Sequence, residues 1–211
     1  MIESNNLLVE GIHDFSAENF GDTQSLLELL NQRADFVAAL ITCSELQVHH
    51  TMSNVMSGQL LPVENLGGIA MPQGEDDSQL NSSSLSTIAY SVERYNLRHL
   101  VVCGHLDCQI VRFVLNKHRA DDPETSTLYF QLGEATRGIM DQFYGDLSKE
   151  RIRPIIMQEH VLLQIESLLT DPHLRNLIAE NDLKLHGWVI DDETNAVYAY
   201  DVTNHSFSAI G

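Results

Sequence analysis

The feature of this sequence that most constrains its fold is an alternation between short, continuous apolar runs and longer amphipathic segments. The runs "DFVAALIT" (35–42) and "RHLVVCG" (98–104) have the length of strands and no polar alternation, so they predict strands that are covered on both faces. The segments 23–34 and 84–97 space their apolar residues for one helical face. This alternation predicts an α/β fold with a mostly parallel central sheet flanked by helices.

The rest of the chain extends the same pattern. "GQLLPVENLGG" (58–68) predicts a second strand that glycines close, and "PQGEDDSQLNSSS" (72–84) predicts a polar loop. "RPIIM" (153–157) predicts a further strand. "LKLHGWVIDDETNAVYAYDV" (183–202) predicts two strands around the turn "DETN", forming a C-terminal hairpin at the sheet edge. Three further helices are expected at 107–118, 158–171 and 172–181.

The length and composition of the chain favour one domain. With 211 residues and 43% hydrophobic content, residues 1–211 can enclose a single substantial core, and they contain neither an internal repeat nor an interdomain linker. Residues 1–35 are expected to form an N-terminal helical arm.

Charge and cysteine content limit the partners and the compartment. The 30 acidic and 12 basic residues give a formal charge of −18, which repels nucleic acid and anionic membrane surfaces. Because no apolar stretch of about 18 residues and no secretory signal are present, we expect a cytoplasmic protein. An odd number of cysteines, Cys43, Cys103 and Cys108, indicates reduced thiols.

Soft metal ligands occur at two predicted strand ends, where open parallel sheets collect their ligands. Cys43 ends the first strand, and "CGHLDC" places His105 after another strand and Cys108 in the first turn of a helix. Two thiolates and one imidazole suit Zn²⁺, and three protein ligands with an open fourth position are typical of catalytic zinc. The alternative is that Cys43 is a core thiol and the His-x-x-Cys spacing is fortuitous. Cys103 is predicted to be a core thiol.

These residues resemble the motifs of β-class carbonic anhydrases, which are Cys-x-Asp-x-Arg at one strand end and His-x-x-Cys at another. The sequence has "CSELQ" (43–47) and "HLDC" (105–108) at a similar separation. The segments "TIAYSVERYNLRHLVVCGH" (87–105) and "KLHGWVIDDETNAVYAYD" (184–201) are also similar to the family, so the resemblance covers most of the chain.

The resemblance implies Zn²⁺ held by Cys43, His105 and Cys108, and reversible hydration of carbon dioxide to bicarbonate. It also implies a homodimer or higher homo-oligomer in which the N-terminal arm packs across a partner. In the family, the motif aspartate accepts a hydrogen bond from the zinc-bound hydroxide, and the motif arginine holds this aspartate away from the metal.

The sequence departs from the family at both positions of this dyad, because Glu45 and Gln47 replace aspartate and arginine. These two residues are the catalytic candidates. Glutamine cannot replace the charge and the bidentate geometry of arginine. Three roles are open for Glu45: a hydrogen-bond acceptor in catalysis, a fourth zinc ligand that displaces water, or a solvated surface acid. Further departures occur at Glu64, Leu61 and Gln109, and together they predict altered or weakened activity.

Three functions therefore compete. The first is a zinc enzyme that hydrates carbon dioxide or a small sulfur analogue such as carbonyl sulfide. The second is a non-catalytic zinc protein of the same fold that binds bicarbonate or a protein partner, which the pair Glu45 and Gln47 favours. The third is a cysteine-nucleophile enzyme using Cys43 and His105, which leaves Cys108 without a role.

Overall fold

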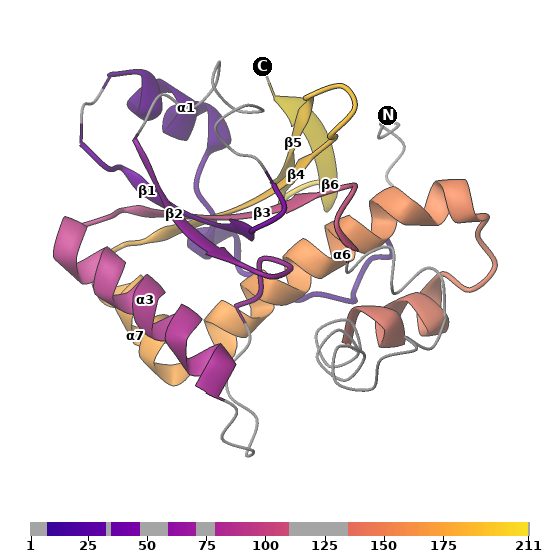
Figure 1. The fold of residues 1–211 in the computed structure, drawn as a ribbon, viewed down its shortest axis with the longest axis horizontal. Coiled ribbons are helices and arrows are strands. Elements are labelled where there is room, and N and C mark those ends of the chain that lie inside the picture. Colours follow the sequence, from indigo (N-terminus) through magenta and orange to yellow (C-terminus); the bar gives the residue numbers. More distant parts are fainter. Residues whose placement is uncertain (1–7, 33–34, 47–58, 71–78, 110–134, 211) are drawn as a thin grey trace.

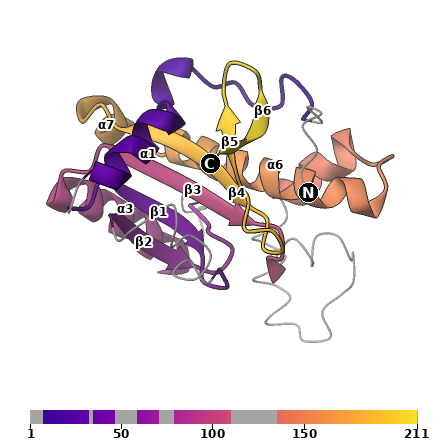
Figure 2. The same ribbon diagram turned by 90° about the horizontal axis from the view of Figure 1, so that it is seen from above.

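A computed structural model describes residues 8–32, 35–46, 59–70, 79–109 and 135–210 (Figure 1). In this part of the chain, one sheet runs through the centre with helices on both faces (Figures 1 and 2). The α/β architecture predicted from the alternating pattern is confirmed. None of the helices described is long and apolar enough to cross a membrane.

The sheet has six strands in the order β2-β1-β3-β4-β5-β6. The first four strands in this order are parallel, and β5 and β6 are added antiparallel at one side. The central strands are buried almost throughout their length, because helices cover both faces. The strands span Ala38–Cys43 (β1), Leu60–Asn65 (β2), His99–His105 (β3), Lys184–Ile190 (β4), Val197–Asp201 (β5) and Ser206–Ile210 (β6).

The C-terminal hairpin is confirmed, since β4 and β5 are antiparallel neighbours joined at the predicted turn. Its place at the edge was wrong. A further strand, β6, pairs with β5 and forms the edge itself. This strand, "SFSAI", is short and half-exposed, so it lacks the continuous apolar run that identified the central strands.

The helices divide unequally between the two faces of the sheet. The buried residues of α1 join a core with Val101 and Trp188 on one face. Those of α6 and α7, together with Ile88 and Val92 of α3, join the larger core on the other face. The helices span Thr23–Gln32 (α1), Gln79–Tyr95 (α3), Lys149–Thr170 (α6) and Pro172–Glu180 (α7), with a 3₁₀ turn at Ala17–Asn19 (η1).

Two sequence predictions on this face were wrong. The apolar run 153–157 is not a strand but lies within α6, where the side chains from Ile155 to Val161 are all buried. A helix enclosed on all sides shows no amphipathic period, and a short apolar run alone does not distinguish it from a buried strand. The predicted polar loop 72–84 also ends early, because α3 already begins at Gln79. Most of the predicted helix 107–118 lies outside the described residues.

The N-terminal arm packs on its own sheet. Leu26 and Leu30 of α1 are fully buried against the same chain, and Leu27 and Leu29 pack beside them. Burial of this apolar face therefore does not require a second chain.

His99 and His186 form a pair between β3 and β4, in which His186 is buried and His99 is half-buried. Their ring nitrogens Nδ1 and Nε2 lie 3.0 Å apart, so one ring donates and the other accepts. Burial, with a smaller contribution from His99, lowers the pKa of His186 to about 3. Gly21 faces this ring so closely that a side-chain Cβ there would lie 2.7 Å from His186. The pair is neutral and tightly enclosed.

We predict that acid destabilises the fold through His186. The unfolded histidine titrates near ~6.5, so between this pH and about 3 the unfolded state binds a proton that the native state does not. Stability then falls as the pH falls through this window, by about 1 kcal/mol from pH ~7.5 to pH ~5.5. Urea unfolding at the two pH values should show a smaller loss in His186→Gln than in the parent. The exposed His173 provides the control His173→Gln, which should lose as much as the parent; equal losses in all three proteins would contradict the assignment.

Candidate metal centre

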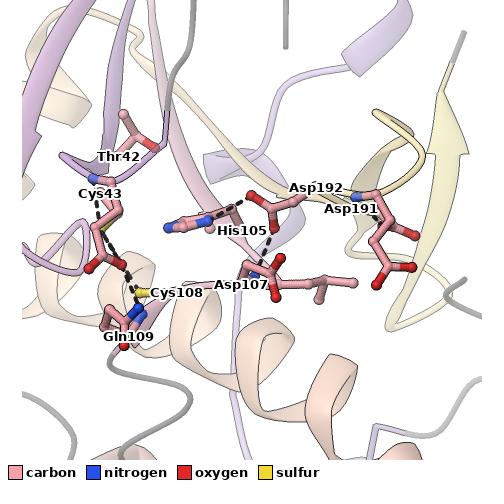
Figure 3. Close-up of polar contacts among 12 residues, drawn as sticks. Thr42, Cys43, His105, Asp107, Cys108, Gln109, Asp191 and Asp192 are labelled. Carbon is pink, nitrogen blue, oxygen red and sulfur yellow. Dashed lines mark hydrogen bonds and ion pairs between the residues drawn. The ribbon is translucent and has the colours of Figure 1, made fainter. Parts of the chain in front are cut away.

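The pairing of β1 with β3 brings the two predicted ligand segments to the same edge of the sheet. Thr42 lies opposite Cys103 in the parallel register, and its buried Oγ1 donates a hydrogen bond to the Cys103 carbonyl at 3.0 Å. Cys43 and His105 are the last residues of their strands. Figure 3 shows their side chains converging with that of Cys108.

The sulfurs of Cys43 and Cys108 lie 3.9 Å apart, and both side chains are buried. The Cys43 sulfur also accepts the backbone N–H groups of Gly67 at 3.3 Å and Glu45 at 3.5 Å. The hydrogen bond from Cys108 has the largest effect, and with the other donors it outweighs burial and lowers the pKa of Cys43 to about 4. The site therefore stabilises a thiolate, which is the form that binds metals.

The backbone around Cys43 requires glycine at position 68. Gly68 has a φ of +64°, and a Cβ there would lie 3.2 Å from the Cys43 nitrogen. The Asn65 side chain closes the same turn, accepting the Ile69 N–H at 2.6 Å and donating to the Ile69 carbonyl at 2.8 Å. The segment "NLGG" thus fixes the amide that Gly67 presents to the sulfur.

Cys103 lies on the opposite face of the sheet and takes no part in this cluster. It is buried in the core beneath α1, and burial raises the pKa of its thiol. Its predicted role as a core thiol is confirmed.

His105 presents one nitrogen to the sulfurs and the other to a carboxylate. Its Nδ1 lies 3.0 Å from Asp192 Oδ1, whereas its Nε2 is buried without a hydrogen-bond partner among the described residues. Burial lowers the pKa of His105, but Asp192 and the Cys43 thiolate outweigh it and raise the pKa to about 9. A buried nitrogen without a partner, facing two sulfurs, fits a bound soft metal ion such as Zn²⁺.

Glu45 completes a group of four donors. One ligand atom from each of Cys43, Glu45, His105 and Cys108 can be chosen so that all lie within 4.8 Å of one another. Glu45 is exposed, and its Oε2 accepts the backbone N–H of Gln109 at 2.8 Å. The structure thus brings together the three predicted ligands and one of the two catalytic candidates, whereas Gln47 lies outside the described residues.

Helix α6 contacts the loop beside Cys43 through two buried polar side chains, His160 and Gln164. The buried His160 donates from Nε2 to the Gly67 carbonyl at 2.9 Å and accepts at Nδ1 from Thr136 Oγ1 at 3.1 Å. Burial lowers the pKa of His160, so the ring is neutral, as this arrangement requires. One turn further along, Gln164 Oε1 accepts the N–H of Ala70 at 2.9 Å.

Gly104 allows α6 to approach the end of β3. A Cβ at this position would collide with the Met157 side chain and would lie 3.0 Å from Val161 Cγ2. The close approach sets the distance between the helix and the two strand ends that carry Cys43 and His105.

Sequence reasoning missed Asp192, His160 and the Gly67 amide. Asp192 belongs to "DETN", which signals only a turn, and its contact with His105 joins residues 87 positions apart. His160 lies in a segment that was expected to be a helix, but nothing in that segment indicates which residue faces the loop. A glycine pair after a strand could have indicated an amide donor as well as a turn.

Comparisons with known proteins show similarity to carbonic anhydrases in sequence and in fold. A family model described as "Carbonic anhydrase" matches residues 38–197. Carbonic anhydrase from Synechocystis sp. is 28% identical over 207 residues, covering 96% of this chain and 73% of that protein. The solved structure of the β-carbonic anhydrase CcaA has a TM-score of 0.70 and 26% identity, covering 89% of this chain and 90% of that one. Tetrameric β-carbonic anhydrases from Sordaria macrospora share the fold, at 22% identity and a TM-score of 0.64, covering 84% of this chain and 86% of the solved chain.

We predict that Gly104→Ala destabilises the fold by about 1–3 kcal/mol, since the added methyl group forces α6 away from β3. Gly138 lies exposed in the helical segment 135–143, where an added methyl group would have nothing within 4 Å, and it provides the control. Gly138→Ala should stabilise by roughly 0.5–1 kcal/mol through helix propensity. Urea unfolding of the metal-free proteins measures both, and a Gly104→Ala variant as stable as the parent would show that the close approach is unimportant.

Proposed function

The chain belongs to the β-class carbonic anhydrase family, and from this premise we propose that it hydrates carbon dioxide to bicarbonate reversibly at Zn²⁺ held by Cys43, His105 and Cys108. The observation that carries the proposal is the buried Nε2 of His105, which has no partner among the described residues and faces two thiols at the ends of β1 and β3. This nitrogen and the two sulfurs belong to a group of donor atoms that lie within 4.8 Å of one another, which supports the proposed ligand set.

Zinc, when bound, lowers the pKa of a coordinated water toward ~7 and supplies hydroxide for attack on carbon dioxide. The chain supplies the ligand set for that chemistry. The hydrogen bond from Cys108 favours the thiolate form of Cys43 most, and the backbone amides of Gly67 and Glu45 add to it. The Asp192 carboxylate keeps a proton on Nδ1 of His105, leaving Nε2 for the metal.

Glu45 is the side chain that would accept a hydrogen bond from a water bound to the metal. One of its oxygens accepts the Gln109 N–H, and a carboxylate has lone pairs for further donors. This contact holds Glu45 in part, but an amide supplies neither the charge nor the two parallel bonds of an arginine. We therefore propose that the activity is weaker than that of a site with the aspartate and arginine pair.

The closeness of four donor atoms also favours a second function. If Glu45 takes the fourth position, the site is closed and the protein is a zinc-binding relative that binds bicarbonate or a protein partner. The homodimer and the cytoplasmic location stay predictions.

We predict one zinc per chain in the parent and close to none in Cys108→Ser, because a neutral hydroxyl is a poor zinc ligand. Loss of the metal should also lower stability, since a ligand at ~1,000 times its Kd adds about 4 kcal/mol to the free energy of unfolding. Elemental analysis after dialysis gives the zinc content, and thermal unfolding with and without zinc gives the stability.

Cys103→Ala is the matched control, because Cys103 is also buried near the end of β3 but faces the other core. This variant should keep its zinc even if the lost sulfur destabilises the fold. Full zinc occupancy in Cys108→Ser would contradict the assignment of Cys108 as a zinc ligand.

We predict that restoring the dyad increases the rate of hydration. Glu45→Asp shortens the side chain and Gln47→Arg supplies the charge, so the double variant should gain more than the two single variants together. A tenfold gain requires only about 1.4 kcal/mol of barrier, which one charge-assisted pair can supply. Stopped-flow hydration of carbon dioxide by the four zinc-loaded proteins measures the coupling.

The outcome separates the two functions. A slow parent and a faster double variant support an enzyme with a weakened dyad. A parent that is inactive and stays inactive in every variant, while folded and loaded with zinc, supports the closed, non-catalytic site. A parent as fast as an efficient hydratase would contradict the proposed roles of Glu45 and Gln47.

A further inference from the structure

Asp192 contacts the segment at the end of β3 that carries two of the three proposed ligands, His105 and Cys108. It lies in the turn between β4 and β5, and its Oδ1 is 3.0 Å from His105 Nδ1. Its Oδ2 accepts the backbone N–H of Asp107 at 2.8 Å (Figure 3). Asp107 immediately precedes Cys108, so one carboxylate is bonded to one ligand and to the residue next to another.

The contact with His105 decides which nitrogen faces the sulfurs. A carboxylate only accepts hydrogen bonds, so Nδ1 of His105 must carry the proton. Nε2 is then the nitrogen that a metal would bind, and it is the nitrogen that is buried without a partner among the described residues. A carboxylate on the far nitrogen also makes the imidazole a stronger ligand.

Several hydrogen bonds hold the turn that carries Asp192. Its neighbour Asp191 accepts the N–H groups of Glu193 at 3.0 Å and Thr194 at 3.4 Å, and its backbone pairs with Ala196 and Asn195. Leu106 N–H extends the pairing of β3 with β4 by donating to the Ile190 carbonyl at 3.0 Å. Asp192 is thus presented by a turn whose backbone is hydrogen-bonded on both sides.

We propose that Asp192 is a positioning residue of the metal centre: Oδ1 fixes the ring of His105, and Oδ2 fixes the turn that leads to Cys108. This role rests on the proposed zinc site, because it acts through two of its ligands. Asp192 does not belong to the group of four donors, so we expect its effect to appear first in metal affinity.

The test compares zinc binding by the parent, Asp192→Ala, Asp192→Asn and a matched control. Asp201 provides the control, because it also accepts backbone N–H groups in a hairpin turn, from Thr203 at 2.8 Å and Asn204 at 3.3 Å, but in the β5–β6 turn. Competition with a chromophoric chelator gives the zinc dissociation constants, and urea unfolding of the metal-free proteins gives the stability of each fold.

We expect Asp192→Ala to weaken zinc binding by roughly 10- to 100-fold, the range for removal of a group that orients a ligand. Asp192→Asn should be intermediate, since its amide oxygen can accept from His105 but its NH₂ group then faces the Asp107 N–H. Asp201→Ala should bind zinc as tightly as the parent. A residue that only stabilised its turn would lower the stability of the metal-free protein and leave the zinc dissociation constant unchanged.

A spectroscopic measurement reports on His105 directly. In the zinc-loaded parent labelled with ¹⁵N-histidine, the Nδ1–H proton should resonate far downfield and exchange slowly, and the His105→Gln spectrum assigns it. In Asp192→Ala this proton should move upfield and exchange faster. A parent that binds no zinc would overturn the proposed function and this role together. Tight binding by both the parent and Asp192→Ala, with an unchanged Nδ1–H resonance, would overturn this role alone.

Discussion

The parallel pairing of β1 with β3 is the interaction on which the metal centre depends. Its register sets Thr42 beside Cys103, so both strands end at the same margin of the sheet. Side chains alternate between faces, and a slip of one residue would turn Cys43 from the core beneath α6 to the core beneath α1, where Cys103 already lies. The buried hydrogen bond from Thr42 to the Cys103 carbonyl favours the observed register, because a slip would leave that hydroxyl to find another acceptor.

Backbone N–H groups provide much of the stabilisation of negative charge at the candidate metal centre. Two amides point at the Cys43 sulfur, a third at Glu45 and a fourth at Asp192. These donors stabilise negative charge without a mobile cationic side chain, and the glycines and hydrogen-bonded turns that present them leave little freedom to reorganise. In a chain of net charge −18, this arrangement gives Cys43, Glu45 and Asp192 each a local hydrogen-bond donor.

The sequence predicted those parts of the structure whose physical cause is local. Continuous apolar runs predicted β1 and β3, and the soft side chains at their ends predicted that Cys43, His105 and Cys108 lie close together, as they do. The run 153–157 was wrongly predicted to be a strand, because a helix that is buried on every side has the same continuous apolar sequence as a central strand. Asp192 could not be found in this way, because its role arises from the return of β4 alongside β3, which brings a turn residue beside a ligand 87 positions away.

The separation of the ligands along the chain also sets an order of assembly. Cys43 and Cys108 are 65 residues apart, and their strands become neighbours only after the intervening segment has crossed one face of the sheet. Because long-range strand pairing forms more slowly than local structure, we expect His105 and Cys108, three residues apart in the sequence, to be near each other before Cys43 joins them. In the proposed zinc site, capture by all three ligands would therefore follow the pairing of β1 with β3, and the bound ion would hold these two strand ends together.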